Sequence, residues 1–376
     1  MNINVIISGD FLPHSRVSHL IASGDYASFF SGISDVNADA DYSIVNLEAP
    51  IVSNPCKPIS KTGPNLKCNV NAIYALKYAG FDCVTLANNH FYDYGETGVS
   101  DTLKACLDNG IDIVGGGRNL HDAEKILYKK IKEKTIAIVN CCEHEWSIAG
   151  KEKGGSAPLD EVKNYYQIKE AESKADHVIV IVHGGTEHYN LPTPRMKKTY
   201  RFFIDAGADV VVNHHQHCIS GYEVYNGKYI FYGLGNFCFD KGIRRRDFWN
   251  EGYLVKLTLG NNINFEIIPY VQCADNPIVD FIVDKDAFYV KINELNAIIA
   301  DDAKLEQAFI NMANQKEKGY LDSLQPYSNR YLKALYSKRL LPSMLFDFWY
   351  RYVLAIFRCE AHRDVMLHVL ENKLKK

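Results

Sequence analysis

Residues 85–95 read TLANNHFYDYG, and this stretch joins an apolar element to a strongly polar end. The apolar run over residues 81–87 is typical of a buried strand. The chain then turns polar, with two amides, an imidazole and a carboxylate at Asn88, Asn89, His90 and Asp93. Four such side chains at the carboxyl end of one strand indicate either an elaborate turn or a functional site.

Other predicted strands end in the same way. Apolar runs at residues 3–8, 43–47, 177–182 and 209–212 are followed by Asp10, Glu48, His183 and the pair His215 and His217. Taken singly, each residue has a plain structural explanation, such as a helix N-cap or a turn. The carboxyl ends of strands in an α/β sheet share one crevice, where ligands bind. Together, the five polar ends therefore predict a divalent-metal centre.

The pattern along the chain predicts an α/β fold. Strands alternate with amphipathic helices up to about residue 215, which favours a largely parallel sheet. After about residue 219, turns at Asn226-Gly227 and at residues 260–262 indicate hairpins and a second, more antiparallel sheet. From about residue 284 the pattern is helical. We therefore expect a domain at residues 1–283 and a helical extension at 284–376.

Composition excludes several classes of protein. The 376 residues are 47% hydrophobic, with a formal net charge of -3, so no basic field for nucleic acid is present. The first residues carry no basic region and no apolar run long enough for a signal peptide or a membrane span, which predicts a cytoplasmic protein. The ten cysteines include no CxxC pair, so reduced thiols are expected.

Six motifs taken together resemble one known family. They are GD at residues 9–10, NLE at 46–48, LANNHxxDxG at 86–95, HGGTEHY at 183–189, HHQH at 214–217 and YGLGNFxFD at 232–240. In order and spacing they look like the CapA-type capsule and poly-γ-glutamate synthesis proteins, a branch of the calcineurin-like metallophosphoesterase superfamily. The resemblance covers roughly residues 3–270. It implies a calcineurin-like sandwich of two β-sheets flanked by helices.

The resemblance also implies a site. It assigns the metal ligands to Asp10, Glu48, Asn89, His183, His215 and His217. His90 would protonate the leaving group, with Asp93 as the partner that orients it. Two departures leave the number of ions at one or two: the superfamily's D-x-H is Asp10-Phe11-Leu12 here, and Glu48 replaces an aspartate. The mixed ligand set suits Mn, Fe, Zn or Mg.

Four further residues are candidates for substrate contact: Lys61, Glu187, His188 and Asn236. Each has an alternative explanation, as a solvated loop lysine, as structural neighbours of His183, or as part of a β-bulge. The Arg244-Arg245-Arg246 run either attracts an anionic substrate or is simply solvated.

Residues 341–357 form an apolar, aromatic stretch within a basic region. Residues 316–376 contain twelve Lys and Arg against six Asp and Glu. The stretch is short for a membrane span and is interrupted by Asp347 and Arg351. It fits a helix packed on the main domain or at an oligomer interface. The alternative is a peripheral helix on a membrane surface.

The function expected from these features is that of a metal-dependent hydrolase or transferase in capsule or cell-surface polymer synthesis. Its substrate would be an anionic polymer, poly-γ-glutamate or polysaccharide, or a phosphorylated precursor, with a metal-activated water as nucleophile and His90 as general acid. Two alternatives remain open. One is a phosphoesterase acting on small substrates, and the other is a non-catalytic, metal-stabilised scaffold of a polymer synthase or export complex.

Overall fold

The computed structural model describes all residues except 1, 31, 243–247, 328 and 375–376. The described chain divides into two compact units, Met1–Glu306 and Gln307–Lys376. The domain boundary expected after residue 283 lies before helix α9 (Lys285–Ala300), which packs into the first unit through Phe288 and Ile292.

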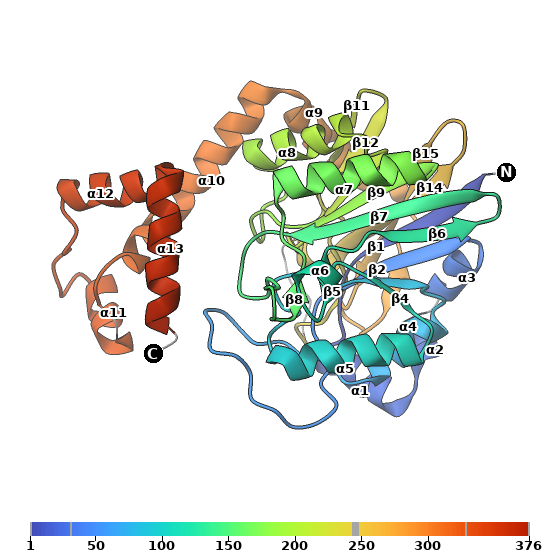
Figure 1. Ribbon diagram of the computed structural model, residues 1–376, viewed down its shortest axis with the longest axis horizontal. Helices are drawn as coiled ribbons and strands as arrows, with labels where there is room; N and C mark the ends of the chain where they lie inside the picture. The colour runs from blue at the N-terminus through green and yellow to red at the C-terminus, as the bar shows by residue number, and fades with distance from the viewer. Residues whose placement is uncertain (1, 31, 243–247, 328, 375–376) are drawn as a thin grey trace. The chain divides into compact units, whose positions relative to one another are not determined.

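The first unit is a sandwich of two sheets with helices on both outer faces (Figure 1). The eight-stranded sheet has the order β16 (Val279–Phe281), β15 (Asn264–Gln272), β14 (Glu251–Leu259), β1 (Ile3–Leu12), β2 (Tyr42–Leu47), β3 (Cys83–Thr85) and β4 (Asp112–Val114), and β13 (Asn236–Phe239) also pairs with β1. The six-stranded sheet has the order β11 (Tyr222–Tyr225), β12 (Lys228–Phe231), β10 (Val210–His214), β9 (His177–His183), β7 (Lys134–Cys142) and β6 (Leu127–Ile131). A small third sheet pairs β5 (Gly116–Gly117) with β8 (Gly155–Ser156).

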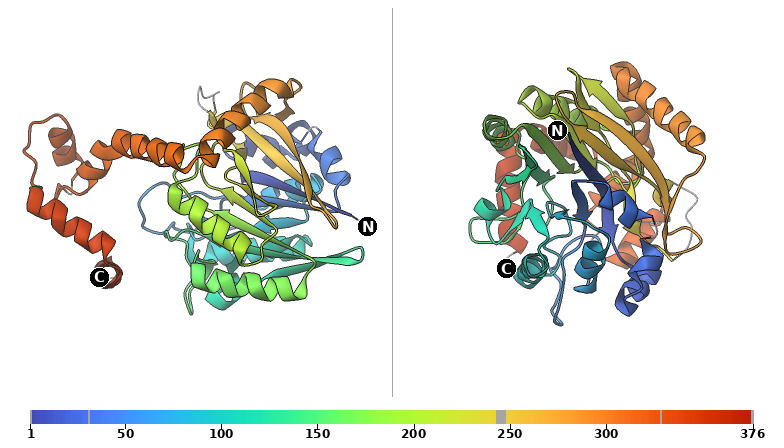
Figure 2. Two further views of the ribbon diagram at one scale, coloured as in Figure 1. Left: turned by 90° about the horizontal axis from the view of Figure 1, so that it is seen from above. Right: turned by 90° about the vertical axis from the view of Figure 1, so that its right-hand side faces the viewer.

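Alternation along the strands explains the layers. In β1, Ile3, Val5 and Ile7 face the other sheet and share a buried cluster with Ile179 and Ile181 of β9. The opposite face of the eight-stranded sheet shares a second buried cluster with α1 (Ser15–Ser23), α2 (Tyr26–Phe29), α3 (Ile33–Ala38), α4 (Asn71–Tyr78) and α5 (Gly95–Asp108). The outer face of the second sheet contacts α7 (Glu161–Lys174) and α8 (Pro194–Asp205), while α6 (Leu120–Ala123) lies beside the small sheet. Figure 2 shows these layers of the first unit from two further directions.

The predicted sandwich fold is confirmed, but the strands after about residue 219 do not form the expected second, more antiparallel sheet of their own. Both predicted hairpins form, at Asn226-Gly227 between β11 and β12 and at residues 260–262 between β14 and β15. The two hairpins join different sheets, because β12 pairs parallel with β10 whereas β14 pairs antiparallel with β1. A short 3-10 helix, Phe248–Asn250, precedes β14. All ten cysteines are free, as expected for reduced thiols.

The second unit is helical, as the pattern predicts. It contains most of α10 (Asp302–Ser323) and the helices α11 (Arg330–Ser337), α12 (Asp347–Arg358) and α13 (Glu360–Leu374). Among the described residues of α11 and α12, none is buried. Many large apolar side chains are exposed there, including Tyr331, Phe348, Trp349 and Phe357. No helix in the described parts of the chain combines the length and the apolar character that a membrane crossing needs.

Candidate metal centre

The fold brings the six predicted metal ligands together at one edge of the sandwich. Asp10 lies in β1, Glu48 follows β2, His183 ends β9, and His215 and His217 follow β10. Asn89 follows β3. Parallel pairing explains the convergence, because β1, β2 and β3 run side by side in one sheet and β9 and β10 in the other. All six residues are buried.

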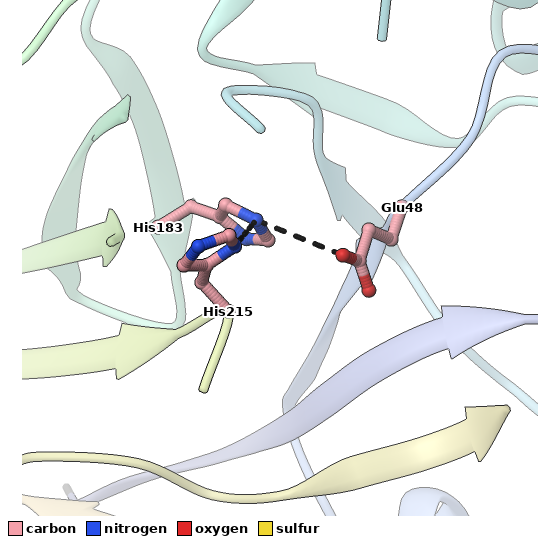
Figure 3. A group of neighbouring side chains, drawn as sticks. All are labelled: Glu48, His183 and His215. Atoms are coloured by element: carbon pink, nitrogen blue, oxygen red, sulfur yellow. Dashed lines mark hydrogen bonds and ion pairs between the residues drawn. The ribbon is translucent and has the colours of Figure 1, made fainter. Parts of the chain in front are cut away.

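The ligand-type atoms form two groups that share Glu48. One group is Glu48, His183 and His215, and the other is Asp10, Glu48 and His217; within each group these atoms lie within 4.8 Å of one another. In the first, His183 Nε2 is 3.0 Å from His215 Nδ1, 3.1 Å from Asn89 Oδ1 and 3.8 Å from Glu48 Oε1. Figure 3 shows Glu48 approaching the two imidazoles from the opposite side. In the second, His217 Nε2 is 3.4 Å from Glu48 Oε1.

Local backbone strain places these side chains. His215 and His217 have φ values of 91° and 54°, in the left-handed region that costs a non-glycine residue about 1–3 kcal/mol. Gly9, next to Asp10, allows β13 to pass close to β1, since a Cβ there would lie 2.0 Å from the Gly235 carbonyl oxygen. The GD motif therefore combines a glycine that permits a close backbone approach with a candidate ligand, Asp10.

Burial shifts the pKa values of the carboxyl groups and imidazoles in the cluster. Both carboxylate oxygens of Glu48 are buried without a hydrogen-bond partner among the described residues, and burial raises the pKa of Glu48 well above its usual value. Burial also raises the pKa of Asp10 to about 7 and lowers the pKa of His183 and His217 well below the usual value. Neutral imidazoles beside two buried carboxyl groups, of which Glu48 has no hydrogen-bond donor among the described residues, fit a divalent cation, which would hold both carboxylates ionised.

The predicted general acid His90 follows the candidate ligand Asn89, and Asp93 holds its imidazole ring in place. Its Nδ1 is 2.7 Å from Asp93 Oδ2, which also accepts a 2.7 Å hydrogen bond from the Leu66 backbone N–H. Lys61 forms an ion pair with the same carboxylate, and its Nζ is 3.2 Å from His90 Nδ1. The Lys61 side chain is only 2% exposed, so the predicted contact with substrate would require this pair to open.

The other candidates for substrate contact divide into two kinds. The side chains of Glu187 and His188 are about half exposed, at 50% and 47%, and they follow β9 at the rim of the cluster. Asn236 is fully buried, and its Oδ1 lies 2.9 Å from His217 Nδ1, so it contacts a candidate ligand instead of facing solvent. The arginine run at 244–246 lies outside the described residues.

Two residues that contact the candidate ligands were not predicted from the sequence. Asn46 donates a 2.7 Å hydrogen bond from Nδ2 to Asp10 Oδ1 and thus fixes that carboxylate. Glu145, in the loop after β7, lies 3.4 Å from Asn89 Nδ2 and 3.9 Å from His215 Nε2. Both residues lie near the carboxyl end of a strand, which is the signal that pointed to Glu48. Asn46 precedes Glu48 by two residues, and Glu145 follows β7, which runs parallel to β9.

This architecture is an α/β sandwich of two sheets with a candidate metal centre at one edge. A family model described as bacterial capsule synthesis protein PGA_cap matches residues 4–241, and the chain belongs to this family. The chain is 31% identical to the capsule biosynthesis protein CapA of Bacillus anthracis over 297 residues, covering 76% of this chain and 72% of that protein. It is 35% identical to the PGA biosynthesis protein CapA of Bacillus subtilis (strain 168) over 266 residues, covering 69% of each.

Solved structures give more distant similarities. A novel phosphatase from Mycoplasma pneumoniae matches with a TM-score of 0.46 and 18% identity, covering 77% of this chain and 97% of that one. A putative 5'-nucleotidase from Staphylococcus aureus matches with a TM-score of 0.43 and 14% identity, covering 79% of this chain and 59% of that one.

Proposed function

We propose that this chain is a metal-dependent hydrolase or transferase that acts on an anionic cell-surface polymer, or on its precursor, in capsule or poly-γ-glutamate synthesis. The observation that carries the proposal is Glu48, a buried carboxylate without donors among the described residues, which is shared by two groups of ligand-type atoms, one with His183 and His215 and the other with Asp10 and His217. Membership of the capsule synthesis family supports the biological setting. The names of the two Bacillus relatives refer to capsule and PGA biosynthesis, which supports the class of polymer.

The residues present assign roles in such a reaction. One or two divalent cations, held by Glu48 with His183, His215 and Asn89 and by Glu48 with Asp10 and His217, would supply an activated water and an electrophile. His90 is proposed to donate a proton from Nε2 to the leaving oxygen or nitrogen, because Asp93 engages Nδ1. Glu187 and His188 are proposed to contact the substrate at the rim.

The first test is the metal content of the purified protein. We expect near-stoichiometric Mn, Fe, Zn or Mg in the wild type and its loss in His183→Ala and in His215→Ala. The control is His121→Ala, which removes an exposed imidazole from α6. If the wild type takes up no metal after reconstitution with each ion, the metal proposal is wrong. A metal-loaded protein justifies a screen of phosphate esters, which would support a small-substrate phosphoesterase, against γ-glutamyl amides.

A scaffold without catalysis is the second candidate. Leu12, fully buried and apolar, stands where the superfamily's D-x-H motif has a histidine, which removes one potential ligand. The scaffold would use its metal only for stability while it binds a polymer synthase or export complex. Under this reading, His90→Ala keeps partner binding and polymer output, whereas an enzyme loses its output in that variant.

We also propose that the second unit contacts an anionic membrane surface. Its helices expose aromatic side chains at Phe348, Trp349 and Tyr352, and basic side chains such as Arg351 accompany them on α12. Aromatic and basic residues together are the combination that binds the lipid interface. This contact would make the protein peripheral to a membrane and would place the first unit close to membrane-bound polymer synthesis.

A further inference from the structure

Glu145 follows β7, a strand that supplies none of the six proposed metal ligands. It follows β7, which pairs parallel with β9 in a register that sets Cys142 opposite His183. The loop after β7 therefore emerges at the same edge as His183. The loop is tied to the cluster two residues further on, because Ser147 Oγ donates a 2.7 Å hydrogen bond to the Asn89 carbonyl oxygen. The side chain of Glu145 is 41% exposed.

The Glu145 carboxylate contacts the rear of two side chains whose front atoms converge on His183. Asn89 donates from Nδ2 to Glu145 Oε2 at 3.4 Å, while its Oδ1 is 3.1 Å from His183 Nε2. His215 Nε2 is 3.9 Å from Glu145 Oε1, while its Nδ1 is 3.0 Å from the same His183 nitrogen. The first contact is a long hydrogen bond and the second is an ion-pair distance.

The donor and acceptor atoms of these groups determine which end of Asn89 and of His215 faces Glu145. An amide has a donor end and an acceptor end, and a neutral imidazole carries its proton on either nitrogen. An ionised carboxylate only accepts, so it favours the NH₂ group of Asn89 and a protonated Nε2 of His215 on its own side. The acceptor atoms Asn89 Oδ1 and His215 Nδ1 are then left facing His183, where a cation needs lone pairs.

We infer that Glu145 is a positioning residue, which orients Asn89 and His215 for a divalent cation. The inference rests on the proposed metal site. It adds a carboxylate outside the six proposed ligands.

The first readout is Zn²⁺ affinity, measured by competition with a chromogenic chelator. Removing an outer carboxylate of this kind weakens metal binding by about 10–100-fold, and we expect that loss for Glu145→Ala. Glu145→Gln keeps one acceptor oxygen and should fall between Glu145→Ala and the wild type. Glu152→Ala is the matched control, because it removes an exposed carboxylate from the same loop. Unchanged affinity in Glu145→Ala would overturn the inference.

The second readout is the tautomer of His215 in the metal-free protein. Long-range ¹H–¹⁵N spectra of histidine-labelled protein at pH 8 distinguish the two ring nitrogens, and His215→Asn identifies the signals among the 13 histidines. We expect protonation at Nε2 in the wild type and a mixed tautomer in Glu145→Ala. An unchanged tautomer with weakened Zn²⁺ binding would overturn the positioning role and make Glu145 a direct ligand. A wild type that binds none of Mn²⁺, Fe²⁺, Zn²⁺ and Mg²⁺ would refute the proposed metal-dependent function, while the tautomer would still test Glu145.

Discussion

A globular protein usually has an apolar core and a polar surface. The candidate metal centre and the C-terminal helices depart from this pattern in opposite ways. The cluster buries carboxyl groups and imidazoles, with Glu48 fully enclosed and without donors among the described residues. Helices α11 and α12 expose aromatic rings and bury none of their described residues. Each arrangement is costly for an isolated chain. The difference supports the two proposals above, because a cation would stabilise the buried carboxylates and a membrane surface would cover the exposed aromatic side chains.

The largest expected effect tests whether the buried polar region is a reaction centre. His90→Ala should lower kcat by about 10²–10⁴-fold, because it removes the proposed proton donor without removing a metal ligand. The measurement is turnover on the best substrate from the phosphate ester and γ-glutamyl amide screen, alongside metal content. His188→Ala, at the half-exposed rim, should change KM more than kcat. Full turnover in His90→Ala with metal retained would leave the scaffold as the better explanation.

The next effect concerns the buried ion pair behind His90. Lys61→Met leaves the Asp93 carboxylate buried and without its cation, which should lower the free energy of unfolding by about 3–5 kcal/mol. Urea denaturation measures the loss, and Lys57→Met, at an exposed position of the same loop, should change little. Adding Asp93→Asn to Lys61→Met should recover part of the stability. Additive losses in the double variant would show that the two side chains do not interact.

A smaller effect of opposite sign is expected at Glu48. Burial raises its pKa above the usual 4.5, so the folded protein keeps this proton to a higher pH than the unfolded chain does. The metal-free protein should therefore lose stability as pH rises from about 4.5 through the folded pKa. Glu48→Gln removes this ionisation and should raise the metal-free Tm at pH 8 by a few degrees, about 1–2 kcal/mol, with little change near pH 4.5.

Metal addition provides the control for this variant. Added Mn²⁺ or Zn²⁺ should raise the Tm of the wild type by mass action and should leave Glu48→Gln nearly unchanged. A Glu48→Gln protein that is less stable than the metal-free wild type at pH 8 would mean that the carboxylate has a donor in solution. The buried region would then need no cation.

The convergence of side chains in the candidate metal centre could be predicted from the sequence because the signals are local. Strand ends carry their polar residues within a few positions, so Asp10, Glu48, His183 and His217 could be named before the sheets were assembled. The same rule, applied to the strand at 134–142, would have found Glu145. Lys61 and Asn236 could not be placed in this way, because their partners Asp93 and His217 are reached through an irregular loop and through the insertion of β13 beside β1.

The local sequence pattern also could not predict which of the two sheets each hairpin joins. The turn at Asn226-Gly227 predicts that β11 and β12 pair, but their attachment to β10 depends on which edge is available. In the second unit, periodicity predicts helices without saying what covers them. The domain boundary after residue 283 was placed where the sequence pattern changes from strands to helices. The first helix after it, α9, nevertheless contributes Phe288 and Ile292 to the core of the first unit.

The smallest expected effect tests the exposed region. If an anionic membrane covers α12, the full-length protein should sediment with vesicles of phosphatidylglycerol and phosphatidylcholine, and less with phosphatidylcholine alone, since basic side chains accompany the aromatic ones. Phe348→Ser should weaken binding about fivefold, because one buried aromatic ring is lost from the lipid interface. Leu107→Ser, which removes an exposed apolar side chain from α5, is the matched control and should bind as the wild type does. If the protein ignores anionic vesicles but light scattering shows a dimer that Phe348→Ser dissociates, then a second copy of the chain covers this surface and the membrane proposal is wrong.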